Sequence, residues 1–231
     1  MKKYYITLSA ILAFLSFYAQ SPADIETDKA VVKQALLFAD PNVAANSMYN
    51  IIAKEGANST YKDSLAYLYF SGRRYSSCFM VCSDILSRNP DKKDILEMEA
   101  VSLENLSAYE KAAQVYAKLV TKTNSNYHAY KMANLYYVLK KYDQATMAID
   151  KARQLKDTGE IKVSYAINQN YSQQVPLAAA IENLKGLIEA AQEKKDAATA
   201  SFQKAVDLFP DFVLAKENLE AMKTGKEVKK E

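Results

Sequence analysis

Residues 109–119, with the sequence YEKAAQVYAKL, decide the fold, because close variants of this stretch occur before and after it in the chain. Residues 75–85 read YSSCFMVCSDI, and residues 142–152 read YDQATMAIDKA. Each stretch begins with an aromatic residue, has a small residue three positions later, and has further small or apolar residues four and seven positions after that one. This spacing predicts a helix whose small residue allows close contact with a neighbouring helix.

The pattern occurs five times in the 231 residues. The small residues that mark it are Ala45, Cys78, Ala112, Ala145 and Ala198, of which the first four are 33, 34 and 33 residues apart. Four residues after them come Tyr49, Cys82, Tyr116, Ile149 and Phe202, and seven residues after them come Ile52, Ile85, Leu119, Ala152 and Ala205. Units of this length cannot bury an apolar face alone, so they stack on one another. The fold class is therefore all-α.

These residues resemble the tetratricopeptide repeat (TPR) family, whose period is 34 residues. The resemblance covers residues 26–222 and implies a right-handed α-solenoid of antiparallel helix pairs, with about five units and a C-terminal capping helix. The sequence departs from the family pattern in three ways. It has no Trp, it has Asn124 and Asp157 where Pro would close a unit, and its first unit is degenerate.

The register breaks between Ala145 and Ala198, where 53 residues replace one period. Apolar residues alternate with polar ones over 161–167 and again over 171–175, around the turn-forming Asn168-Gln169-Asn170. Alternation around a polar turn favours a short β-hairpin insertion near 161–175, within an irregular segment over 158–176. A short helix followed by a loop is the alternative.

Both ends of the chain differ in composition from the repeats. Lys2 and Lys3 precede an apolar run over 6–17, and small residues follow, which predicts a signal peptide over 1–20 that is cut between residues 19 and 23. The segment 17–20 resembles export signals of Bacteroidetes-type bacteria. We therefore expect a periplasmic, cell-envelope or secreted protein with no transmembrane segment in the mature chain. Residues 223–231 are highly charged and are expected to be disordered.

Composition disfavours several classes of function. The 30 Lys and Arg nearly balance the 27 Asp and Glu, so nucleic acid is not an expected partner. The five Gly residues are scattered, which leaves no phosphate-binding loop. With one His and two Cys, the chain offers little for a metal site or a nucleophile and base pair, so we expect no metal, no cofactor and no enzyme.

Two residue types still need an interpretation. Cys78 and Cys82 lie one helical turn apart at packing positions, where cysteine behaves as a small apolar residue. A disulfide between them, or a functional thiol, is the alternative reading. His128, the single histidine, is expected at an exposed helix start.

The 17 tyrosines are the strongest indication of a binding surface. In TPR arrays the first helix of each unit lines a concave groove. The resemblance implies that the groove residues here are Asp63, Tyr67, Phe70, Glu97, Val101, Glu104, Tyr127, Tyr130, Asn134 and Tyr137. They describe an aromatic groove with an acidic side, and Tyr130, Asn134 and Tyr137 share one helix face.

We therefore expect a non-catalytic interaction scaffold that holds a peptide or protein segment in this groove. The hairpin-like insertion is a rival binding element, and a redox or enzymatic role for Cys78 and Cys82 is the alternative function. The partner's identity and the oligomeric state do not follow from the sequence.

Overall fold

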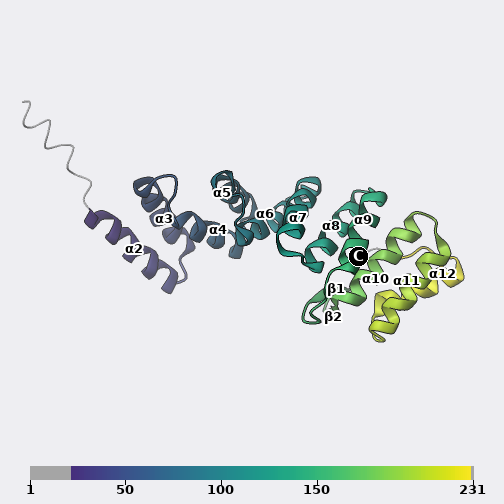
Figure 1. The fold of residues 1–231 in the computed structure, drawn as a ribbon. Coiled ribbons are helices and arrows are strands. Elements are labelled where there is room, and N and C mark those ends of the chain that lie inside the picture. The colour runs from purple at the N-terminus through teal and green to yellow at the C-terminus, as the bar shows by residue number, and fades with distance from the viewer. Residues whose placement is uncertain (1–21, 230–231) are drawn as a thin grey trace, which may run out of the picture. The chain divides into compact units, whose positions relative to one another are not determined.

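The computed structural model describes residues 22–229, so the expected signal peptide lies outside the described residues. Contacts group the chain into two compact units, one up to Pro90 and one from Asp91, and each is considered by itself. The described residues form eleven α-helices and one two-stranded antiparallel sheet (Figure 1). The prediction of antiparallel helix pairs with a hairpin insertion is confirmed.

The N-terminal unit consists of two helix pairs, α2 (Pro22–Leu37) with α3 (Pro41–Glu55), and α4 (Tyr61–Ser71) with α5 (Tyr75–Arg88). Asp40 starts α3, because its side-chain Oδ1 accepts hydrogen bonds from the backbone N–H groups of Asn42 and Val43 at 3.2 and 3.1 Å. Such an N-cap satisfies amides that the helix leaves unpaired. The small residues Ala45 and Cys78 are buried, as the repeat pattern requires.

The C-terminal unit continues with the same architecture. Its elements are α6 (Lys93–Asn105), α7 (Tyr109–Thr123), α8 (Asn126–Val138), α9 (Tyr142–Gln154), β1 (Lys162–Asn168), β2 (Tyr171–Pro176), α10 (Leu177–Ala191), α11 (Lys195–Leu208) and α12 (Val213–Thr224). Ala112, Ala145 and Ala198 are fully buried where the helices of a pair meet. Leu219 of α12 is also buried, so this last helix covers the end of the stack.

The turn within every helix pair has the same construction. One residue adopts a positive φ between 55° and 61°, and the next residue donates its backbone N–H to the carbonyl five positions earlier. This is the Schellman arrangement, which satisfies carbonyls at a helix C-terminus. The five left-handed residues are Ala39, Arg73, Ser107, Lys140 and Glu193. Because none of them is glycine, the composition gives little sign of these turns.

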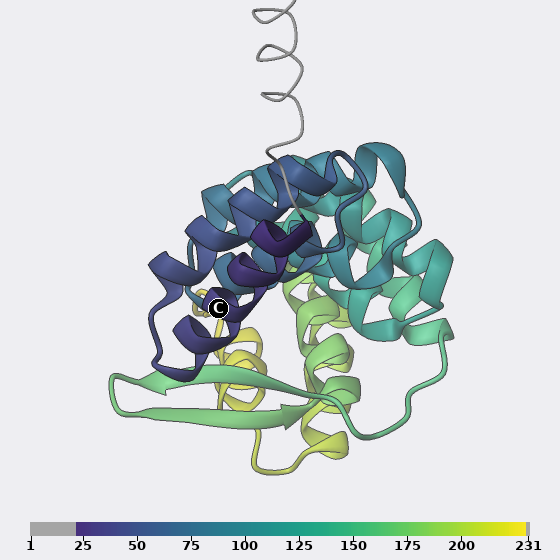
Figure 2. The same ribbon diagram turned by 90° about the vertical axis from the view of Figure 1, so that its left-hand side faces the viewer.

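The hairpin packs on its own unit through one face. Tyr165, Gln173 and Val175 are buried, whereas the alternate residues Ser164 and Ala166 are exposed. The Gln173 side chain donates to the carbonyl of Asp211 at 2.6 Å and accepts from the amide of Val213 at 3.1 Å. Figure 2 shows the two strands side by side, crossing in front of the C-terminal helices of the unit. The hairpin is therefore anchored to the turn between α11 and α12.

The sequence predicts disorder from residue 223, whereas in the structure Lys229 still contacts α12. Thr224 still belongs to α12, and the backbone N–H of Lys229 donates to Oδ1 of the fully buried Asn218 at 2.7 Å. The Asn218 amide donates in turn to the Lys229 carbonyl at 3.3 Å. One buried side chain, which no repeat pattern marks, thus holds this segment against α12.

Candidate protein-interaction surface

In the N-terminal unit, the predicted groove residues Asp63, Tyr67 and Phe70 lie on α4 at spacings of four and three, so they share one face. Tyr67 is 66% exposed, the most open of the groove tyrosines in the described chain. Phe70 is half-buried, and its ring forms a T-shaped pair with that of Tyr75, with centroids 6.3 Å apart. This face therefore presents one open aromatic side chain beside a fixed one.

In the C-terminal unit, the predicted acidic residues of α6 face basic residues of α8. Glu104 forms an ion pair with Lys131 at 2.7 Å and accepts a short hydrogen bond from the Tyr116 hydroxyl. Burial, followed by the charge of Glu104, raises the pKa of Tyr116, so this phenol stays protonated. The expectation of an acidic groove side is wrong at Glu104, because that charge is already neutralised within the protein.

His128 is buried rather than exposed, which corrects the sequence interpretation. Its Nδ1 lies 2.9 Å from the Thr123 hydroxyl, and its Nε2 lies 3.3 Å from Glu97 on α6. Burial lowers the pKa of His128, while the Glu97 carboxylate opposes this effect. The ring therefore acts as a neutral polar contact between two helices, and it draws Glu97 toward α8.

Tyr130 is also not a surface residue, although the sequence placed it in the groove. Its side chain is 2% exposed, and its hydroxyl lies 3.1 Å from the hydroxyl of Tyr165 on β1. The reason is the hairpin, which covers this end of α8. The other α8 residues Tyr127, Asn134 and Tyr137 are half-buried, and Tyr137 also meets Tyr142 with centroids 6.2 Å apart.

The equivalent positions on α10 are also buried. Adding 53 residues to Tyr130 and Asn134 gives Asn183 and Leu187, and both are fully buried. The groove positions at Tyr130 on α8 and at Asn183 and Leu187 on α10 are therefore closed to a partner. Glu97, Val101, Asn134 and Tyr137 keep at least partial exposure. In this unit the accessible part of the predicted surface lies on α6 and the C-terminal half of α8.

The two cysteines are at core positions. Cys78 and Cys82 are fully buried on α5, and their Sγ atoms are 3.8 Å apart without a disulfide bond. Packing is therefore their structural role. Within residues 22–229, no group of three or more His, Cys, Asp or Glu side chains is arranged to hold a metal ion.

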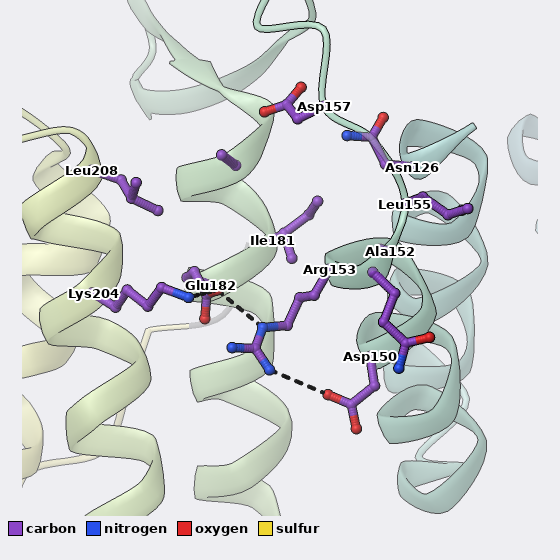
Figure 3. A pocket seen from close by; sticks show the side chains of 12 residues that line it. Asn126, Asp150, Ala152, Arg153, Leu155, Asp157, Ile181, Glu182, Lys204 and Leu208 are labelled. Carbon is purple, nitrogen blue, oxygen red and sulfur yellow. Dashed lines mark hydrogen bonds and ion pairs between the residues drawn. The ribbon is translucent and has the colours of Figure 1, made fainter. Parts of the chain in front are cut away.

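A pocket of about 600 Å³ opens between α9, α10 and α11 (Figure 3). On its wall the buried carboxylate of Glu182 accepts from Arg153 at 3.0 Å and from Lys204 at 2.6 Å. Arg153 also approaches Asp150 at 3.6 Å. Because Arg153 lies on α9, Glu182 on α10 and Lys204 on α11, these ion pairs tie three successive helices together.

By sequence, no family model and no curated protein matches the chain. By structure, MamA aligns at a TM-score of 0.63 with 12% identity, over 81% of this chain and 92% of the other. MamA from Desulfovibrio magneticus RS-1, from residue 41 to its end, aligns at 0.60 with 14% identity, over 84% and 99%. YrrB, described as a TPR protein with an unusual peptide-binding site, aligns at 0.63 with 16% identity, over 83% and 88%.

The chain has the tetratricopeptide repeat fold. At these identities the likeness concerns the fold alone, and the five equivalent turns described above agree with it. The TPR repeat pattern located the first helices of the pairs correctly, but it did not identify which of their residues the hairpin covers. The alternation over 161–167 carries that information, because it places Tyr165 on the inner face of β1. Lys131 and His128, by contrast, stand at positions that no repeat offset marks.

Proposed function

We propose that the chain is a non-catalytic protein–protein interaction scaffold that binds a peptide or protein segment on the exposed face of its first helices. The supporting observation is that Tyr67 remains two-thirds exposed on α4, at the position equivalent to Val101 and Asn134 on later helices. Tyrosine gives large contact area at a low cost in side-chain entropy. One structural relative, YrrB, is described as having a peptide-binding site.

The test is capture of a partner from the cell envelope with the mature chain, followed by binding measurements on variants. Tyr67→Ala and Tyr137→Ala should each weaken binding by about 1–3 kcal/mol, as hot-spot truncations do. Lys118→Ala and Gln144→Ala on the second helices are the matched controls and should bind normally. If all four variants bind alike, this face is not the working surface.

We also propose export to the cell envelope or beyond. The support is the basic start and apolar run of residues 2–17, followed by small residues. Within residues 22–229, no helix has the length and apolar character needed to cross a membrane. Intact-mass measurement on the envelope and culture fractions should find a chain that begins between residues 20 and 24. A chain that retains Met1 and stays in the cytoplasm would contradict this proposal.

A further inference from the structure

We propose that the outer edge of β1 binds an extended segment of a partner protein as a third, antiparallel β-strand. This proposal rests on the proposed function and names a recognition mode for it. The occupant is a short stretch of polypeptide with alternating apolar residues, and it lies between β1 and α12.

The hydrogen-bond register shows which backbone groups of β1 point outward. The amide of Leu177 donates to the carbonyl of Ile161 at 3.0 Å, and these two residues continue the register in which Val163 faces Val175. In antiparallel pairs, bonded and non-bonded residue pairs alternate. Val163 and Tyr165 therefore bond to β2, and the backbone groups of Lys162, Ser164 and Ala166 point away from it.

The two edges of the hairpin are not equivalent. Among the described residues, β1 pairs with β2 alone, and no backbone group hydrogen-bonds to the outward amides of Ser164 and Ala166. On the opposite edge Pro176 lacks an amide hydrogen, which prevents a continuous ladder there. The edge of β1 is thus the one that can accept a strand.

A hollow of about 490 Å³ adjoins this edge. The four consecutive residues Ser164, Tyr165, Ala166 and Ile167 line it, and no residue of β2 does. Because successive side chains of a strand point to opposite faces, one space can border four in a row only along the strand's edge. The hollow therefore lies where a third strand would run.

The other wall of the hollow sets the side-chain preference. Val213 and Leu214 of α12 border it and are half-buried, and the ion pair between Glu217 and Lys229, 2.9 Å long, stands beside them. A third strand would direct every second side chain toward Val213 and Leu214 and the others toward solvent beside Ser164. An alternating segment of about four residues spans the lined edge at 3.4 Å per residue.

The probe is a pool of capped, fluorescein-labelled hexapeptides with Val, Ile or Leu at positions 1, 3 and 5 and Ser, Thr or Lys at positions 2, 4 and 6. Fluorescence anisotropy with the full chain identifies the tightest member. In an antiparallel third strand, the amides of the polar positions point at β1. Backbone N-methylation of the polar positions should weaken binding about tenfold or more, the effect of losing one or two backbone hydrogen bonds. N-methylation of the apolar positions should change it by less than about threefold.

On the protein side, Ala166→Pro removes an outward amide from β1. Ser172→Pro is the matched control, because Ser172 faces Ala166 across the hairpin and its amide points out from the other edge. Ala166→Pro should lose the peptide and Ser172→Pro should keep it. Hydrogen exchange on the unmodified chain provides a readout without a substitution, since the peptide should slow exchange at Ser164 and Ala166 but not at Ser172 and Gln174.

Three results would overturn the proposal. They are the absence of any binding member in the pool, equal effects of the two N-methylated sets, and a wild-type dimer that Ala166→Pro converts to a monomer, which would assign the edge to a second copy. If Tyr67→Ala abolishes partner capture while Ala166→Pro leaves it intact, the scaffold function stands and the strand-addition mode fails. If the peptides bind as described while no partner is captured, the strand-addition mode stands and the scaffold function fails.

Discussion

At the scale of single residues, the left-handed turn residues carry a cost that glycine would remove. Lys140 has a φ of 57° in the turn between α8 and α9. A side chain there costs roughly 1–2 kcal/mol, and glycine loses part of this gain through the entropy of the unfolded chain. Lys140→Gly should therefore raise the free energy of unfolding by about 0.5 kcal/mol.

The matched control is Lys118→Gly in the interior of α7, where the same substitution should lower the free energy of unfolding by about 1 kcal/mol. Urea denaturation of both variants measures the two signs. Equal destabilisation by the two changes would mean that the turn geometry at Lys140 is not as described.

His128 makes stability depend on pH in a defined direction. Burial lowers its pKa below the ordinary value of 6.5, so the unfolded chain binds a proton more readily than the folded one. Stability is then complete above about pH 6.5 and falls as the pH drops below that value. The melting temperature should decline below pH 6.5, before the carboxylates titrate near pH 4.

His128→Asn keeps a polar atom near Thr123 but does not titrate in this range. Its melting temperature should stay level where that of the wild type falls. A decline of equal slope in both proteins would assign the effect to other groups.

Side-chain exposure is where sequence reasoning failed for single residues. The TPR offsets placed Tyr130 on the correct helix, and His128 was expected at an exposed helix start, but both side chains are buried because other elements cover them. Tyr130 is covered by a hairpin that begins 32 residues later, and His128 is held against α6 by Glu97. Exposure depends on such long-range contacts, which a repeat pattern does not contain.

At the scale of elements, the close approach of α10 and α11 depends on a missing side chain. A Cβ atom at Gly186 would lie 2.6 Å from Cε1 of Phe202. Helix propensity favours Gly186→Ala by up to about 1 kcal/mol, but overpacking costs about 1–3 kcal/mol and should dominate. We expect a net loss in the free energy of unfolding, measured by urea denaturation.

The double variant Gly186→Ala with Phe202→Leu tests the cause. The smaller side chain at position 202 should make room for the new methyl group, so alanine should cost less there than beside phenylalanine. If alanine costs the same in both backgrounds, the contact with Phe202 is not responsible.

Most elements could be predicted from the sequence, because each helix pair repeats the same small and apolar positions and the hairpin shows its own alternation. The turns within the pairs could not, since Arg73, Ser107, Lys140 and Glu193 have no shared turn chemistry. Their left-handed geometry follows from the packing of the helices that they join.

At the scale of the whole molecule, the chain should behave as two folding units. The part from Asp91 contains a large apolar cluster of its own, with Tyr130, Tyr165, Phe202 and Phe212 among its members, and it has α12 as a cap. Repeat arrays are stabilised by nearest-neighbour contacts, so such a part can fold alone. A fragment of residues 91–231 should show a helical circular dichroism spectrum and a cooperative melt.

The complementary fragment of residues 22–90 has two helix pairs and no capping helix of this kind, so it should melt at a lower temperature. A fragment of residues 91–231 that is unfolded in isolation would mean that its stability depends on the residues before it.

The anchor of the hairpin has a consequence for the order of biosynthesis. Gln173 leaves the ribosome well before Val213, to which it bonds 40 residues later. At about 5–20 residues per second, the hairpin waits about two to eight seconds for its attachment point. A product that stops before Asp211 therefore carries an unattached pair of strands, which is prone to aggregate edge to edge. The final helix thus completes the array and also ends the period in which the nascent chain is vulnerable.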